Sequence, residues 1–478
     1  MDLKNSEKIV ERYRLQNLAS KLSYMEGKKE GMKYPQNWHK VSKCRVARYS
    51  SDSDVFVLKS KEHGTSHFGG LIVCARAWAC PVCAPIMQAK RAERVAQAFQ
   101  WAYNKEQRSD AIDLSIEEYK RRAFEDSQFE NGFISKKKRR QFMPSPDLLN
   151  SELKVAMITF TTPHSKSDTV QTLFPKFQLA MSYMKEHRRY RDFKKAIGYV
   201  GEITATEITF GLNGPHIHRH VLYFIKDTSD LETETVFKDF FNRSWGHALQ
   251  RAGLLDDCGT KQYENFLKHG VDVIARAHES DYIIKQGTES AWGADSEMTK
   301  ASSKQGKKFG RTPFEVLAGS SSSYRDAKIF IDYIKGTKGK AQLTFSAGFK
   351  KLIGLQELDD EEQDILDASE SDDPADLLAS LDYSDWSLII KTQSRGELLK
   401  VATEQGKEGI FNFIDKLKEK QNTSDEDLFD KHFESLCSRF DSDPDSFLDP
   451  RNAKDSESMK SFLIDFYSDD LEDLERAS

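Results

Sequence analysis

The chain has 478 residues, and its 76 Asp and Glu residues against 71 Lys and Arg give a formal net charge of −5. This length allows two or three domains. No apolar run approaches the roughly 18 residues of a membrane span, and the charged N-terminus does not resemble a secretory signal. We therefore expect a cytoplasmic protein without a membrane partner.

The charges are unevenly distributed along the chain. Residues 356–478 carry 35 acids and 13 bases, a balance of −22, whereas residues 1–355 carry 41 acids and 58 bases, a balance of +17. A basic body is typical of a nucleic-acid-binding protein. An acidic tail is an interaction segment, a segment that masks the basic surface, or a solvated helical domain.

The first region, residues 1–103, is expected to begin with a helix within 1–43 and to end with a basic helix, Pro85–Tyr103. Four cysteines cluster between these two helices. A Cys-x2-Cys pair places two thiolates on one tetrahedral centre, so we predict a structural zinc site. His67 is an alternative fourth ligand, and buried free cysteines are the alternative interpretation. The candidate zinc ligands are Cys44, Cys74, Cys80 and Cys83.

Residues 104–150 are highly charged and are expected to form a linker or insertion. Their basic run, Lys136–Arg140, is a solvated loop or a phosphate contact. Hydrophobic periodicity then predicts a mixed strand and helix domain over 151–355. The expected strands are Val155–Thr161, Ile197–Ile203, Thr204–Phe210, the histidine strand that follows, and Gln342–Ser346. The expected helices are Asp168–Arg191, 233–252, 270–286 and Tyr324–Ile334.

The acidic end is expected to consist of a disordered linker, 356–379, and a helical module, 380–478. Within the module, Asp425–Phe440 carries phenylalanines at helical spacing. A mobile basic loop is expected at 299–312.

Three histidines alternate along one apolar strand, in Gly214–Phe224. Residues two apart in a strand point to the same face, so the imidazoles of His216, His218 and His220 converge. Convergent imidazoles make a divalent-metal site, whereas the plainer interpretation is a polar strand face at a sheet edge.

A hairpin turn at residues 211–214 would add a carboxylate to these histidines. If Phe210 pairs with Pro215, Glu207 falls opposite His218. A mixed site of imidazole and carboxylate suits Mg or Mn. A shift of the register by one residue would turn Glu207 to the other face.

A candidate nucleophile follows downstream. On a helix, Glu279, Tyr282 and Lys285 share one face. A tyrosine phenol can attack phosphorus when a metal polarises the phosphate, and a nearby ammonium stabilises the phenolate.

Several motifs occur in the order typical of one family. Over about 74–355 the chain resembles the rolling-circle replication initiator (Rep) proteins of bacterial plasmids, which are HUH endonucleases. The matching segments are Cys74-x5-Cys80-x2-Cys83, Ile158–His164, Glu207–Gly214, His216-x-His218-x-His220, Tyr282-x2-Lys285, Ser296–Lys300, Arg311–Phe314, Lys335–Gly336 and Leu343–Gly348.

The resemblance implies an α+β fold with an HUH-type antiparallel sheet, its histidine strand central, flanked by helices. It implies nicking of one strand at a plasmid origin by Tyr282, which gives a 5′-phosphotyrosyl link and a free 3′-OH. His218 and His220 would hold the metal with Glu207 as third ligand. His216 or His164 would be a ligand or phosphate positioner, and Glu279 would activate water for termination.

The chain departs from the family at Arg219, where an apolar residue is usual, so His216 and His218 are an alternative metal pair. One tyrosine is present where related transposases often carry two. The alternatives to an initiator are an HUH-type transposase or relaxase, and a non-catalytic zinc-containing DNA-binding regulator. DNA is the expected partner, with a host helicase as a further one; the oligomeric state is left open. The residues expected to line the DNA path are Lys304, Lys307, Lys308 and Arg311.

Overall fold

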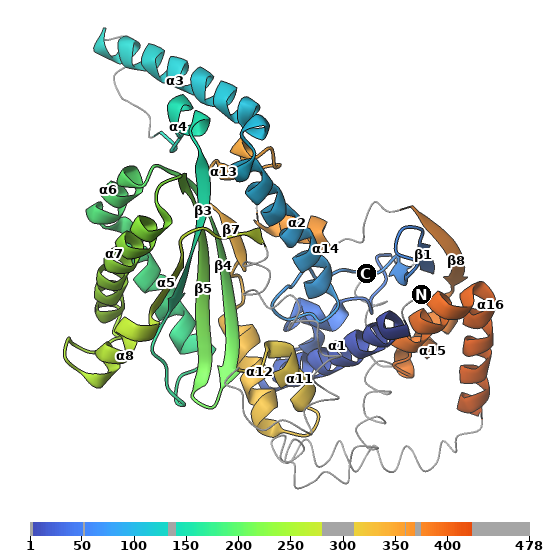
Figure 1. Cartoon of the computed structure of the whole chain (residues 1–478). Helices are drawn as coiled ribbons and strands as arrows, with labels where there is room; N and C mark the ends of the chain where they lie inside the picture. The colour runs from blue at the N-terminus through green and yellow to red at the C-terminus, as the bar shows by residue number, and fades with distance from the viewer. Residues whose placement is uncertain are drawn as a thin grey trace.

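Figure 1 shows the computed structural model of the chain, which describes residues 3–50, 53–131, 140–279, 310–358, 360–368 and 374–422. Two antiparallel sheets organise the fold. The larger has the strand order β6-β3-β5-β4-β7 and the smaller the order β2-β1-β8. The expected α+β class is confirmed, and the histidine strand β5 is central as expected. No helix within the described ranges is long and apolar enough to cross a membrane.

The larger sheet is built around one long hairpin. Strand β4 is continuous where two strands were expected, and Gly211 pairs with Gly214, which leaves a two-residue turn. Strand β3 pairs with the other side of β5. The strands are β3 (Leu153–Thr161), β4 (Tyr199–Gly211), β5 (Gly214–Lys226), β6 (Val271–Ile274) and β7 (Leu343–Phe345).

Helices cover one face of this sheet. Helices α5 (Val170–Glu186), α6 (Arg188–Ala196) and α7 (Asp230–Arg251) lie along it, with α8 (Lys261–His269) at one end (Figure 1). Phe160 of β3 packs edge-to-face on Phe241 and Trp245 of α7, with ring centroids 5.1 and 5.6 Å apart. Such pairs contribute about 0.5–1.5 kcal/mol each beyond the burial of their apolar area.

The opposite face is covered in part by α2 (Cys83–Tyr103). Phe99 of α2 lies 6.3 Å from Phe224 of β5, and Phe349 at the start of α13 (Phe349–Leu352) lies 4.6 Å from Phe224. The sheet therefore separates two apolar cores. Near the hairpin end lie α11 (Pro313–Gly319) and α12 (Tyr324–Gly336), the latter as expected.

One expectation for the middle of the chain was wrong. A helix was expected at 270–286, but Val271–Ile274 is the edge strand β6, because Val, Asp, Val and Ile alternate and pair with β3. The charged region 104–150 contains α3 (Ser109–Glu130), which projects from the body in Figure 1, and α4 (Pro146–Asn150). Of the basic run, Lys136–Arg139 lies outside the described residues, and Arg140 pairs with Asp126 at 2.9 Å.

The N-terminal unit consists of a long helix, two short turns and a hairpin. Its elements are α1 (Leu3–Lys29), η1 (Pro35–Asn37), η2 (Lys40–Lys43), β1 (Val55–Ser60) and β2 (Ser66–Gly69).

Part of the expected acidic linker and module folds onto this unit. In place of disorder, α14 (Asp360–Ala368) docks on α2, where Arg94 donates to Asp367 at 2.6 Å. Strand β8 (Ala375–Leu381) pairs with β1. Helices α15 (Tyr383–Lys391) and α16 (Arg395–Asn422) follow, and α16 packs on α1. The linker forms structure because its carboxylates meet arginines of α2 and its apolar strand completes an open sheet edge. The expected helix Asp425–Phe440 lies outside the described residues.

Candidate active site and cysteine cluster

The three histidines of β5 occupy the outer half of the sheet face on which α2 packs. Along the strand, Ile217 and Val221 point into the core beneath α5 and α7, so His216, His218 and His220 point the other way. Farther along the same face, Leu222 and Phe224 belong to the core under α2. The face changes from apolar to polar within one strand.

Strand pairing brings further polar residues to this place. Glu207 pairs with His218 as expected, and Phe210 pairs with Pro215. Thr159 of β3 pairs with His220 on one side and with Asp272 of β6 on the other. Directly opposite residues share a face of the sheet. The structure therefore adds Thr159 and Asp272 to the residues expected from the sequence.

His220 is the most constrained of these residues. Its side chain is buried, with Nδ1 3.0 Å from the Thr159 hydroxyl and Nε2 3.6 Å from a Glu207 carboxylate oxygen. Nε2 is buried and has no hydrogen-bond partner among the described residues. Leaving such an atom unsatisfied costs about 1–3 kcal/mol. A nitrogen held this way, beside a carboxylate, fits a divalent cation with mixed nitrogen and oxygen ligands.

The other histidines stack in a row. Ring centroids are 4.6 Å apart for His164 and His216, 3.9 Å for His216 and His218, and 6.2 Å for His218 and His220. Burial, then the neighbouring His218 and His164, lowers the pKa of His216 to about 3. At neutral pH this imidazole is therefore uncharged, which is the form that binds metals.

The histidine cluster is looser than the cysteine cluster described below. Within the part of the chain that the structure describes, three or more candidate ligand atoms of His, Cys, Asp or Glu lie within 4.8 Å of one another at the cysteines alone. His220 and Glu207 form the close pair, so the ring of His218 has to turn toward them to join a common ion.

Arg219, the departure from the family pattern, lies on the opposite face. Its guanidinium sits 5.2 Å from the Phe177 ring and donates to the Thr206 hydroxyl at 3.1 Å. Burial lowers its pKa to about 10, so it stays charged. The arginine is accommodated beneath α5 and leaves the histidine face unchanged.

Three residues outside the metal site were expected to take part in catalysis, and the structure describes one of them, Glu279. The segment before it runs beside Val155, since the Ala277 amide donates to the Val155 carbonyl at 2.8 Å. Val155 is four strand positions from Thr159, about 13 Å. Glu279 therefore follows a segment at the end of the sheet away from the histidines. Tyr282 and Lys285 lie outside the described residues.

Arg311 is the one expected DNA-contacting residue that the structure describes; Lys304, Lys307 and Lys308 lie outside. Its guanidinium donates twice to Asp326 of α12, at 2.6 and 2.7 Å, and its backbone pairs with Phe210. The side chain is 46% exposed. Arg311 thus anchors α12 to the hairpin, with part of its surface open to a phosphate.

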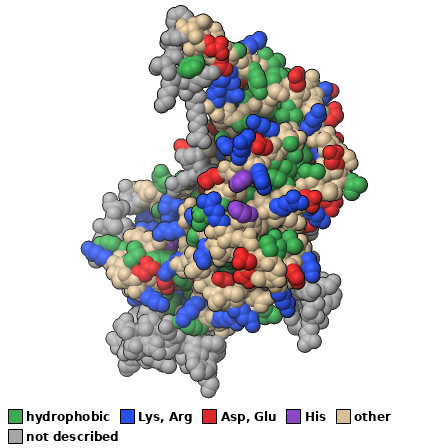
Figure 2. Space-filling view, turned by 90° about the vertical axis from the view of Figure 1, so that its left-hand side faces the viewer, with side chains coloured by type: hydrophobic (Ala, Val, Ile, Leu, Met, Phe, Trp, Pro, Cys, Tyr) green, Lys and Arg blue, Asp and Glu red, His purple; other side chains and the backbone are tan. Residues whose placement is uncertain are grey.

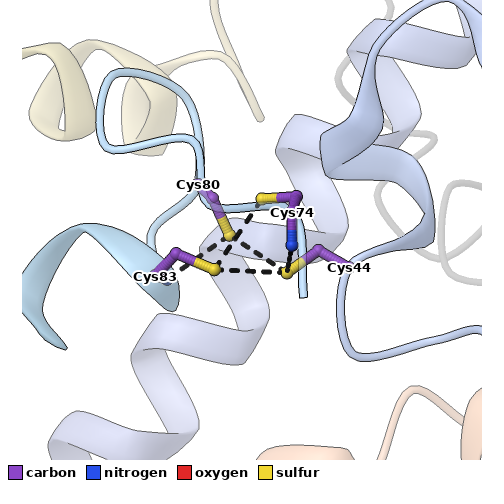
Figure 3. A group of neighbouring side chains, drawn as sticks. All are labelled: Cys44, Cys74, Cys80 and Cys83. Carbon is purple, nitrogen blue, oxygen red and sulfur yellow. Dashed lines mark hydrogen bonds between the residues drawn. The ribbon is translucent and has the colours of Figure 1, made fainter. Parts of the chain in front are cut away.

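The four clustered cysteines form one buried group, as Figure 3 shows. Sγ of Cys44 lies 3.4 Å from that of Cys83 and 3.6 Å from that of Cys80, and Cys74 lies 3.7 Å from Cys83. Thiolates bound at about 2.3 Å to a tetrahedral zinc ion would lie about 3.8 Å apart. These spacings fit zinc, and Cys44, not His67, completes the group.

The backbone around the cysteines is shaped for sulfur contacts. Arg45 and Ala75, directly after Cys44 and Cys74, have positive φ angles of 56° and 50°. Each such residue costs about 1–3 kcal/mol. The Cys74 amide donates to Cys44 Sγ at 3.4 Å. Burial raises the pKa of the Cys74 thiol, so forming the thiolate there costs free energy. A bound cation would offset that cost.

The class that these observations define is an α+β protein with a histidine–carboxylate face on a central strand and a four-cysteine group that could hold a metal such as zinc. Over 393 residues the chain is 25% identical to "Protein rep" of Streptomyces lividans, which covers 72% of this chain and 78% of that protein. This similarity supports a Rep protein. No family model matches the chain, and no solved structure matches it.

Proposed function

We propose that this protein initiates plasmid rolling-circle replication by nicking and rejoining one DNA strand at the origin. The observation that carries the proposal is the buried, unsatisfied Nε2 of His220, held 3.6 Å from Glu207 on the central strand. The similarity to a Rep protein and the Tyr282 motif support it.

The residues of the sheet face would hold a Mg or Mn ion. His218, His220 and Glu207 are the proposed ligands, and the Thr159 hydroxyl holds the ring orientation of His220. His216 or His164 would position the scissile phosphate. When bound, the cation would withdraw electron density from that phosphate.

The proposed reaction exchanges one phosphate ester bond for another, so the DNA strand can later be rejoined. The Tyr282 phenol oxygen attacks the phosphorus atom and loses its proton to solvent. The bond from phosphorus to the 3′-oxygen breaks, and that oxygen takes up a proton to become the 3′-OH primer. Lys285 stabilises the phenolate. Glu279 follows the segment beside Val155, away from the histidines, so it is not assigned the role of activating water. A zinc ion bound by the four cysteines would stabilise the fold of the N-terminal unit.

The experiment is incubation with labelled single-stranded origin oligonucleotides of the parent replicon, with Mn, with Mg and with EDTA, followed by denaturing gels. We expect a metal-dependent covalent adduct that Tyr282→Phe abolishes. The matched control is Tyr49→Phe, since Tyr49 is 85% exposed and distant in sequence from the site. Cleavage that persists in EDTA would exclude the mechanism.

The same experiment separates the alternatives. Tight binding without any adduct favours the non-catalytic zinc-containing regulator. An adduct formed at transposon ends or at a transfer origin, and not at the replication origin, favours the transposase or relaxase.

A further inference from the structure

A groove lies on the helical face of the large sheet, on the side opposite to His216, His218 and His220. It has a volume of about 750 Å³ and is lined by the end of α5, by α6 and by α7. Figure 2 looks onto this side of the molecule, where histidine side chains lie among Lys and Arg side chains. The proposed nicking reaction does not use this groove.

The groove has an aromatic floor. Phe193 of α6 and Phe240 of α7 stack with centroids 3.9 Å apart and planes within 3°. Tyr183 and Tyr190 also line the groove. Tyr190 is fixed from below, because its hydroxyl lies 2.8 Å from that of Tyr223 in the sheet. Tyr190 and Phe193 are buried, so the part-buried rings of Tyr183 and Phe240 are the ones on which a nucleobase can stack.

The rim of the groove is cationic. Helix α6 contains five Lys and Arg residues and one Asp in nine residues. On α7, Arg243, His247 and Arg251 recur every four residues and therefore share one face. Arg243 and His247 line the groove with one acid, Asp239, and the Arg251 guanidinium lies 3.7 Å from the centre of the Tyr183 ring.

We propose that this groove binds single-stranded DNA, separately from the histidine face. Stacking rings below and guanidinium groups at the rim match the two parts of an unpaired nucleotide, its base and its phosphate. A duplex buries the faces of its bases and would meet only the rim. The excess of cations over acids in the lining favours a polyanion over a neutral protein partner.

The test measures binding of the full chain to a 5′-labelled oligothymidylate in EDTA by fluorescence anisotropy at several salt concentrations. Arg189→Glu/Arg243→Glu removes two rim cations. Loss of two phosphate contacts should lower the slope of log affinity against log salt by about 1.4. The control, Lys105→Glu/Lys120→Glu, makes the same charge change on exposed residues of η3 (Lys105–Arg108) and α3 and should bind more tightly than the groove variant.

A second variant tests stacking. Tyr183→Ala should weaken oligothymidylate binding by about fivefold or more, as expected for a lost base stack, with less effect on a duplex of equal length. Ultraviolet cross-linking should attach the oligonucleotide to peptides of α5, α6 or α7. Groove variants that bind like the matched control, with cross-links elsewhere, would overturn the proposal. Because these measurements are made in EDTA, their outcome is independent of whether the protein nicks DNA.

Discussion

At the scale of single residues, His220 shows how a buried polar atom indicates a ligand. Thr159 holds Nδ1 on one side, Glu207 lies beside Nε2, and the strand fixes the ring between them. When a second group holds the other nitrogen of a histidine ligand, loss of that group typically weakens metal binding by roughly 10- to 100-fold.

Thr159→Val therefore tests the site without removing a proposed ligand. Valine keeps the shape of threonine and removes its hydroxyl, so we expect Mn affinity to fall about tenfold. Isothermal titration with the full chain measures it. Thr204→Val, a buried threonine opposite Val221 on the other face of the sheet, is the control. Equal affinities in the two variants would contradict the role assigned to Thr159.

His39 gives a prediction about pH. Burial, then the charges of Arg76 and Lys338, lowers its pKa to about 4. Its Nδ1 accepts a hydrogen bond from the Val41 amide at 3.2 Å, which caps η2. The unfolded chain binds a proton below pH 6.5, whereas the folded chain does so only below about pH 4. Stability should therefore fall as the pH falls through this window, by at most about 3 kcal/mol.

The control is His39→Asn, which can cap the same turn but does not titrate. Urea unfolding at pH 7 and pH 5 compares the two proteins. We expect the wild type to lose more stability than the variant between these pH values; an identical loss would mean that His39 is not held uncharged.

At the scale of elements, the β4–β5 hairpin decides which side chains meet. The two-residue turn sets the register, and the register places Glu207 opposite His218. Gly214 ties this turn to the loop that carries His164. Its φ is +95°, and a Cβ there would lie 2.4 Å from the Ser165 carbonyl oxygen.

Gly214→Ala should therefore loosen both the turn and the stack of His164 on His216. We expect a loss of about 1–3 kcal/mol in the free energy of unfolding, together with weaker Mn binding. Gly211→Ala is the matched control on the paired position, because its nearest neighbouring atom is 4.0 Å from the added Cβ. A Gly214 variant as stable as the Gly211 variant would show that the contact with the Ser165 loop is not needed.

Elements with clear periodicity could be predicted from the sequence, and short ones could not. Tyr324–Gly336 has a consistent apolar stripe, and its helix was expected. Val271–Ile274 is too short for its pattern to distinguish a strand from a helix, and only pairing with β3 makes it a strand.

At the scale of the whole molecule, a late segment of the chain packs against the N-terminal unit. Arg395 is fully buried and donates to the Arg45 carbonyl at 2.8 Å, next to the cysteine group. The indole of Trp386 donates to the Val46 carbonyl at 2.9 Å. Residues 374–422 are therefore part of the N-terminal unit, although they follow the large sheet in the sequence.

The contacts between residues 374–422 and the N-terminal unit predict which truncated chains are stable. A chain that ends after Asn422 keeps β8, α15 and α16 and serves as the reference. A chain that ends after Leu355 exposes the edge of β1 and should lose several kcal/mol, roughly ten degrees or more in Tm. Differential scanning calorimetry measures both. If the shorter chain were as stable as the longer, β8, α15 and α16 would form a separate unit.

The sequence alone determined the local geometry of both clusters. Alternation along β5 put three imidazoles on one face, a short turn put Glu207 beside them, and Cys-x2-Cys put two thiols together, because each depends on residues close in the chain. Only the tertiary structure decided that Thr159 and Asp272 join the histidines, that Cys44 completes the thiols, and that β8 pairs with β1. Those contacts join residues far apart in sequence, and the packing of apolar faces and the pairing of open strand edges select them.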